Sequence, residues 1–123
     1  MTRINAGISV EELPSKLLLA ELREIKRIPN LISKGKYSLQ GIPDKFTLGT
    51  GHVKFFYNKG LYLWNRYQAL RNEALSRGYN VSDFSESWSE YPSHLYNDWQ
   101  DTEARSNILE RFKEKGFNLI KNG

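Results

Sequence analysis

Apolar positions recur at helical spacing in three separate stretches of this chain. The first runs from about residue 14 to about residue 33, the second from about residue 51 to about residue 77, and the third from about residue 102 to about residue 115. No stretch keeps the alternation of apolar and polar residues that is typical of a half-buried strand. The pattern predicts an all-α fold: one compact domain over residues 1–123, with three main helices and long loops.

Proline and glycine punctuate these stretches where helices begin and end. Pro14 stands where the missing N–H of proline costs nothing, and Pro29 should kink or break the first helix near its end. Asp101 is a suitable N-cap for the third helix. Gly78 and Gly116 stand where glycine commonly ends a helix.

The composition limits the chemistry that is available to the chain. The 123 residues are enough for one core, and the absence of cysteine excludes disulfides, thiolate nucleophiles and iron–sulfur clusters. No window is long and apolar enough to cross a bilayer, and the N-terminus lacks the apolar core of a secretory signal, so we expect a cytoplasmic protein. His94 has no partner pattern, which makes a metal site improbable, and His52 beside Gly51 fits a cap or packing residue better than a ligand.

Charge is distributed unevenly along the chain. Residues 1–77 hold 13 Lys and Arg against 6 Asp and Glu, whereas residues 78–123 hold 5 against 8. The stretch 81–103 has six acids and no Lys or Arg. This asymmetry favours a polyanion, with nucleic acid as the first candidate, as the partner of the first part; the alternative is a solubilising scatter of charge.

One carboxylate of the first helix lies on its apolar side. With successive residues turned by about 100°, Glu24 falls between Leu17 and Ile28 on one side and Ala20 and Leu31 on the other. A carboxylate in such a place has its pKa raised by desolvation and lowered by nearby cations, as a general acid or base often does. The structural alternative is an ion pair of Glu24 with Arg27 or another cation at the edge of the core.

A cationic stripe runs beside Glu24 on the same helical wheel. Its members are Lys16, Arg23 and Arg27, at spacings of i, i+7 and i+11. If Glu24 is functional, this stripe is placed to hold phosphates. Most aromatic side chains of the second helix are expected in the core.

Four stretches of the chain resemble the pyrimidine-dimer DNA glycosylases of the bacteriophage endonuclease V type. They occur in the order and near the spacing of that family, and they cover the first two-thirds of the chain: MTRIN at 1–5, LLLAELREIKRIP at 17–29, FTLGTGHVKFFYNK at 46–59 and RGYNV at 77–81. The resemblance implies a compact, mainly helical domain that acts on damaged double-stranded DNA as a monomer. It implies two activities, removal of one base of a cyclobutane pyrimidine dimer and cleavage of the backbone at the abasic site. It requires neither a metal nor an organic cofactor.

The resemblance also assigns roles to residues. Thr2 is the nucleophile, through the α-amino group that removal of Met1 exposes, and Glu24 is the essential carboxylate. The remaining matched positions are expected to bind DNA: Arg3, Arg23, Arg27 and His52. An amine that attacks C1′ displaces the base and forms an imine, and Glu24 stabilises positive charge and transfers protons.

The chain departs from the family pattern in two places. Lys16 and Leu17 stand where the family has a Gln-His pair, and Lys16 keeps the ability to bind a phosphate. The C-terminal aromatic-basic cluster of the family is missing from KEKGFNLIKNG at 113–123. Four aromatic residues either replace it or belong to the core: Trp88, Tyr91, Tyr96 and Trp99.

The loss of the C-terminal cluster leaves alternatives to dimer excision open. Arg111 and Lys115, at i and i+4, are candidates for the last phosphate contacts. Amine-based lyase chemistry is better supported than dimer specificity. The alternatives are an abasic-site lyase without preference for dimers and a non-catalytic DNA-binding module.

Overall fold

The computed structural model describes residues 4–100 and 104–120 of the 123-residue chain. Its secondary structure consists of helices and loops, with no strand among the described residues, so the all-α prediction is confirmed. The elements in chain order are η1 (Val10–Glu12), α1 (Ser15–Ile25), α2 (Arg27–Ser33), α3 (His52–Phe55), α4 (Gly60–Ser76), η2 (Ser85–Trp88), η3 (Ser93–Leu95) and α5 (Ala104–Lys115).

The first predicted helix is divided into α1 and α2, because the helix is interrupted at Lys26. Pro14 immediately precedes α1, as predicted. Pro29 lies inside α2, and the break at Lys26 falls three residues before it rather than near the end of the stretch. The reason is that a helical proline lacks the N–H that would bond to residue i−4, here Ile25, and its ring clashes with that carbonyl.

The second predicted helix is also divided, so the prediction of one continuous helix over residues 51–77 was wrong. Between α3 and α4, Lys59 has non-helical φ and ψ of −128° and 45°. Its ammonium donates to the carbonyl of Phe55 at 2.9 Å and to Asn58 Oδ1 at 2.8 Å, which satisfies a carbonyl left free by the end of α3. The expected stop at Gly78 is confirmed: φ is 89°, and Tyr79 N–H donates to Ala74 O at 3.0 Å.

The third predicted helix corresponds to α5, which ends as expected. Gly116 follows it with φ of 75°, and Phe117 N–H donates to Phe112 O at 2.8 Å. The predicted cap Asp101 and first residue Thr102 lie outside the described residues.

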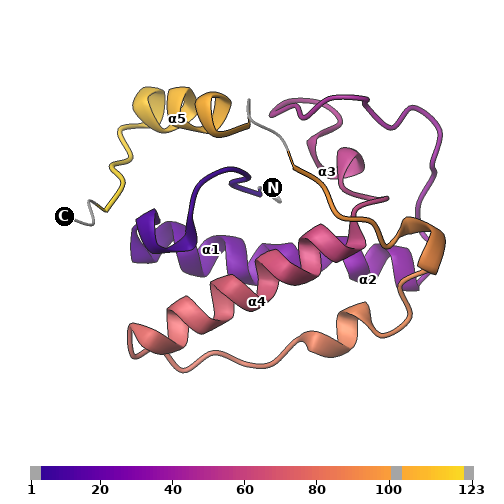
Figure 1. Ribbon diagram of the computed structural model, residues 1–123, viewed down its shortest axis with the longest axis horizontal. Coiled ribbons are helices and arrows are strands. Elements are labelled where there is room, and N and C mark those ends of the chain that lie inside the picture. Colours follow the sequence, from indigo (N-terminus) through magenta and orange to yellow (C-terminus); the bar gives the residue numbers. More distant parts are fainter. Residues whose placement is uncertain (1–3, 101–103, 121–123) are drawn as a thin grey trace.

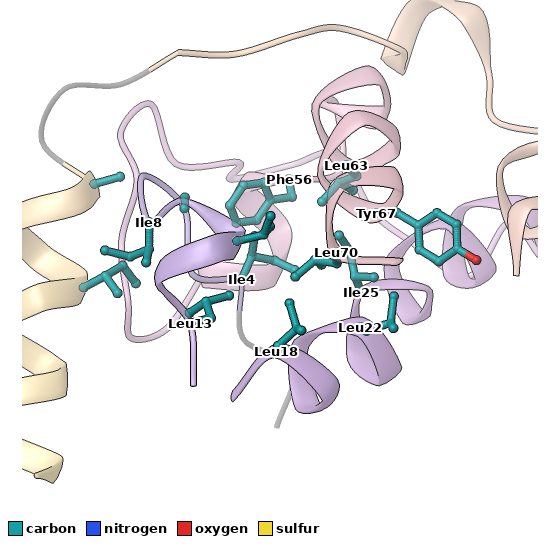
Figure 2. Packing of buried hydrophobic residues seen from close by; sticks show 14 of the residues in the cluster. Ile4, Ile8, Leu13, Leu18, Leu22, Ile25, Phe56, Leu63, Tyr67 and Leu70 are labelled. Atoms are coloured by element: carbon teal, nitrogen blue, oxygen red, sulfur yellow. The ribbon is translucent and has the colours of Figure 1, made fainter. Parts of the chain in front are cut away.

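The N-terminal segment, residues 4–9, lies between α1 and α5 (Figure 1). Helix α1 packs against α4, and the segment inserts Ile4, Ala6 and Ile8, all 0% exposed, into the same core. Figure 2 shows Ile4 and Ile8 within the cluster that includes Leu18 of α1 and Leu63 of α4. Full burial of one isoleucine side chain contributes about 1.5–3 kcal/mol, so apolar packing alone holds this segment firmly.

Helix α5 crosses the N-terminal segment at Gly7. Gly7 has φ of 81°, and a Cβ added there would lie 2.6 Å from the backbone nitrogen of Arg105. The guanidinium of Arg105 donates to Glu12 at 2.7 and 2.8 Å and to Gly7 O at 3.2 Å. The hydrogen bond from Arg105 holds the pKa of Glu12 below its usual value. The close approach and the ion pair together dock α5 beside the start of the chain.

Gly7→Ala is expected to destabilise the fold by about 2–4 kcal/mol, because it adds a left-handed backbone penalty to a clash with backbone atoms that cannot move aside. Gly116→Ala is the matched control, since Gly116 also has positive φ but has nothing within 4 Å of an added Cβ. Urea unfolding of both variants measures the difference. Equal destabilisation of the two variants would show that α5 does not need this close contact.

No helix in residues 4–100 or 104–120 combines the length and the apolar character that crossing a bilayer requires.

Candidate active site

His52 is the first residue of α3, and it points into the protein. Its Nε2 accepts a hydrogen bond from Ile4 N–H at 2.9 Å, and its Nδ1 lies 2.7 Å from the carbonyl oxygen of Thr47. Because a carbonyl only accepts, Nδ1 carries the proton in this arrangement and the ring is neutral. Gly51, at φ 93°, gives the chain the left-handed turn from which α3 begins.

This position differs from the expectation that His52 contacts DNA. The residue is 3% exposed and its ring lies edge-on to Phe46 and Phe56, each with centroids at 5.4 Å. The packing interpretation of His52 fits this placement. Its backbone partner, Ile4, is two residues from Thr2.

A buried ion pair holds the next residues of the same segment. Arg66 of α4 donates from Nε to Glu21 Oε2 at 2.7 Å and from Nη2 to Glu21 Oε1 at 3.1 Å. Glu21 also accepts from Asn5, at 3.3 Å from the backbone N–H and at 2.9 Å from Nδ2. Arg66 in turn donates to the carbonyl of Asn5 at 3.0 Å and to the carbonyl of Ile8. We call His52, Glu21 and Arg66 the N-terminal anchor.

The ion pair of Arg66 and Glu21 is buried, and both groups are charged. The side chains of Arg66 and Glu21 are 9% and 0% exposed. Burial acts to lower the pKa of Arg66, but the charge of Glu21 and the hydrogen bonds to it raise that pKa above its ordinary value. The guanidinium is therefore a permanent cation at the centre of the anchor.

Sequence reasoning missed Glu21 and Arg66, although Glu21 had a signal. In α1, Glu21 lies one turn from Leu17 and one turn from the fully buried Ile25, on the apolar side. A carboxylate that stays ionised in a buried position is usually paired with a cation. The partner could not be identified in advance, because Arg66 is 45 residues away and only the packing of α1 on α4 brings the two together.

Glu24 lies one turn further along α1, at the edge of a pocket of about 150 Å³. Its side chain is 17% exposed, and its Oε2 lies 2.8 Å from Arg27 Nη1. The expected ion pair with Arg27 is thus present, and Glu24 also faces a pocket, so the two interpretations of this residue are not exclusive. The pocket is lined by Asn5, Leu17, Ala20, Glu21, Glu24, Arg111, Phe112 and Phe117.

Arg111 of α5 brings a cation to the pocket of Glu24. The same side chain lines a larger neighbouring hollow of about 410 Å³, which lies between α5 and residues 46–49. Lys115, one turn on, is exposed and lines neither of these two pockets. Of the two predicted C-terminal contacts, Arg111 is therefore the one that lies beside Glu24.

The predicted cationic stripe is exposed, but it does not follow one straight helix. Lys16 and Arg23 belong to α1, whereas Arg27 is the first residue of α2 beyond the break at Lys26. Arg27 also lines a groove of about 400 Å³ together with Asn30, Leu31, Lys34, Lys36 and Val53. Exposed basic side chains therefore extend from the Glu24 pocket along α1 and α2.

Of the four aromatic residues considered as replacements for a C-terminal cluster, one belongs to the core and the other three are half-buried and pack against it. Trp88 is 6% exposed, and the rings of Trp99 and Phe46 stack with centroids 5.8 Å apart. Tyr91 donates its hydroxyl to the carbonyl of Tyr57 at 2.6 Å, and Tyr96 packs on the edge of the core. This packing fits the interpretation of these residues as part of the core better than their interpretation as a substitute cluster.

Two predicted site residues, Thr2 and Arg3, lie outside the described residues. Within residues 4–100 and 104–120, no three His, Cys, Asp or Glu side chains gather as a metal site would require.

The first 87 residues of the chain match a known family, whose model is described as pyrimidine dimer DNA glycosylase. The matched region contains the complete N-terminal anchor, Glu24 and Arg27, and it extends through α4. Helix α5, with Arg111, lies beyond it.

Proposed function

The chain belongs to the pyrimidine dimer DNA glycosylase family, and we propose that it excises one base of a cyclobutane pyrimidine dimer and then cuts the strand at the resulting abasic site. The observation that carries the proposal is the pocket that Glu24, Asn5 and Arg111 share. It places a carboxylate, the start of the chain and a cation around one small hollow. The proposed substrate is damaged double-stranded DNA.

The proposed nucleophile is the α-amino group of Thr2 after removal of Met1. Thr2 precedes the pocket-lining Asn5 by three residues, which span at most about 11 Å of extended chain. This short separation along the chain supports the assignment. A free α-amino group has a pKa near 8, so about a tenth of it is neutral at pH 7, against less than about a thousandth of an ordinary lysine. It is the better nucleophile without any burial.

The amine forms a bond to C1′ of the sugar as the bond from C1′ to the base breaks, and the base leaves with a proton. Opening of the sugar ring gives an imine between the Thr2 nitrogen and C1′. Removal of a C2′ proton then breaks the bond from C3′ to the phosphate oxygen, which cuts the strand by β-elimination. Hydrolysis of the imine releases the amine.

Glu24 is proposed to stabilise the cationic sugar and to carry the protons of these steps. Its surroundings support this role, because apolar side chains, among them Leu17 and Phe112, line much of the pocket and strengthen charge interactions within it. Arg27 holds one carboxylate oxygen at 2.8 Å and so orients the group.

Cations around the pocket are proposed to bind the flanking phosphates. Lys16, Arg23 and Arg27 lie along α1 and the start of α2, and Arg111 approaches from α5. Arg3 is assigned to this set by its family position alone. Such contacts hold C1′ in place against the amine and make binding dependent on salt.

A second candidate function is an abasic-site lyase that has no preference for dimers. One observation favours it: Trp88 is buried in the core and Trp99 is half-buried with its ring stacked on Phe46, so neither presents a fully exposed aromatic surface for lesion recognition. This candidate keeps the same amine, the same Glu24 and the same phosphate contacts.

Three matched duplexes separate these functions: one with a single cyclobutane pyrimidine dimer, one with an abasic site at the same position, and one undamaged. We expect strand cleavage of the first two and none of the third, measured on denaturing gels. Cleavage of the abasic duplex alone would favour the second candidate. Salt-dependent binding to all three without cleavage would contradict both and leave a DNA-binding module.

A further inference from the structure

The N-terminal anchor contacts the backbone of the segment that leads to Thr2. His52 holds Ile4 N–H, Glu21 holds Asn5 N–H, and Arg66 holds the carbonyls of Asn5 and Ile8. Four backbone groups of a five-residue stretch are thereby fixed by side chains from α1, α3 and α4. The direction of the chain where it enters the pocket is determined by these contacts.

Attachment of the segment does not require these polar contacts. Ile4, Ala6 and Ile8 are all fully buried and already secure it to the core. A buried ion pair is often no more stabilising than apolar residues of the same volume, because desolvation of both charges offsets their attraction. Hydrogen bonds, by contrast, depend strongly on direction, so the contribution specific to the anchor is orientation.

The contact of His52 lies closest to the proposed nucleophile. Its Nε2 bonds to the residue two positions after Thr2, while its Nδ1 bonds to Thr47, which belongs to the loop before α3. One ring thus links the start of the chain to the loop that lines the hollow beside Arg111.

We propose that the N-terminal anchor is a positioning device, in which His52, Glu21 and Arg66 aim the amine of Thr2 at the pocket of Glu24 without touching the substrate. This inference rests on the proposed function. A displacement of about 1 Å between reacting groups lowers a rate by about a hundredfold. Loss of an anchor contact should therefore slow imine formation much more than it weakens DNA binding.

A pair of His52 variants separates positioning from packing. Glutamine places a polar atom near the position of Nε2 and keeps an acceptor for Ile4 N–H, whereas asparagine places one near Nδ1 and keeps only the contact with Thr47. Both variants are neutral, polar and smaller than histidine. A role limited to packing predicts similar behaviour of the two.

The measurement is the single-turnover rate of borohydride trapping on a saturating abasic duplex, together with the Kd for the same DNA. For His52→Asn we expect a fall in rate of about 10- to 100-fold with Kd within about twofold, and for His52→Gln a rate within about threefold of the unmodified protein. Equal rates for the two variants would overturn the proposal. Failure of the unmodified protein to form any adduct would instead overturn the proposed function.

Two further variants control for folding. Tyr67→Phe removes a partly buried hydrogen bond that Phe84 N–H donates to the Tyr67 hydroxyl at 2.7 Å. This hydrogen bond is not one of the anchor contacts, so the variant should keep the trapping rate. The double variant Glu21→Leu with Arg66→Met removes both charges together, so it should fold even where a single charge change does not. It should trap about tenfold or more slowly per folded molecule; a rate equal to that of Tyr67→Phe would overturn the role of the ion pair.

Discussion

Glu24→Gln is expected to lower both base excision and strand cleavage by about 10²- to 10⁴-fold, which is the usual contribution of general acid–base catalysis. Glutamine keeps the shape of the side chain and a hydrogen-bond acceptor for Arg27. It loses the negative charge that stabilises the cationic sugar and the ability to move a proton. The fall should appear in the rate at saturating DNA, because Glu24 is assigned to the chemistry and the phosphate contacts are left in place.

The matched control for this experiment is Glu73→Gln in α4. Glu73 pairs with Arg77 at 2.8 Å and is 19% exposed, close to the 2.8 Å and 17% of Glu24 with Arg27. Both changes therefore break the ion pair of a largely buried glutamate, although Arg77 is less exposed than Arg27, at 15% against 57%. We expect a loss of up to about 1 kcal/mol of stability for Glu24→Gln and at least as much for Glu73→Gln. Near-normal rates for Glu24→Gln, or an equal loss for Glu73→Gln, would remove Glu24 from the mechanism.

Blocking the amine of Thr2 is expected to abolish adduct formation completely. A protein that carries a protease-cleavable extension directly before Thr2 has an amide in place of the amine, and an amide nitrogen is not nucleophilic. Cleavage of the extension to expose Thr2 should restore activity to the same sample. Retention of Met1 has the same chemical consequence as the extension, so intact-mass measurement belongs with every assay.

The extended protein also provides its own control for binding. Its basic residues on α1 and α2 are unchanged, so its Kd for the abasic duplex should remain within about threefold of the processed protein. Trapping by the uncleaved protein at an undiminished rate would show that another amine acts. Lys59 is the one to inspect first, because burial lowers its pKa.

The sequence predicted the helical fold and placed Glu24 on the apolar side of the first helix, because both inferences depend on local periodicity. It placed the break in the first helix too late and predicted no break in the second. The missing N–H of Pro29 interrupts the first helix about one turn before the proline itself. In the second, the side chain of Lys59 ends α3 by donating a hydrogen bond to Phe55 O.

The N-terminal anchor could not be predicted in the same way. Ile4 and His52 are 48 residues apart, and Asn5 and Glu21 are 16 apart, so their contacts depend on how α1, α3 and α4 pack. Arg111 is similar, since only the crossing of α5 over Gly7 brings that helix beside the start of the chain. The sequence indicated a functional role for His52 and Arg111, but it did not identify the residues that they contact.

Identification of the nucleophile is the most direct test of the proposed function. The unmodified protein, with Thr2 exposed, is treated with borohydride on an abasic duplex, and the covalent adduct is digested and mapped by mass spectrometry. We expect one adduct, on the N-terminal peptide and at the nitrogen of Thr2. An adduct on any lysine, or no adduct at all, would contradict it.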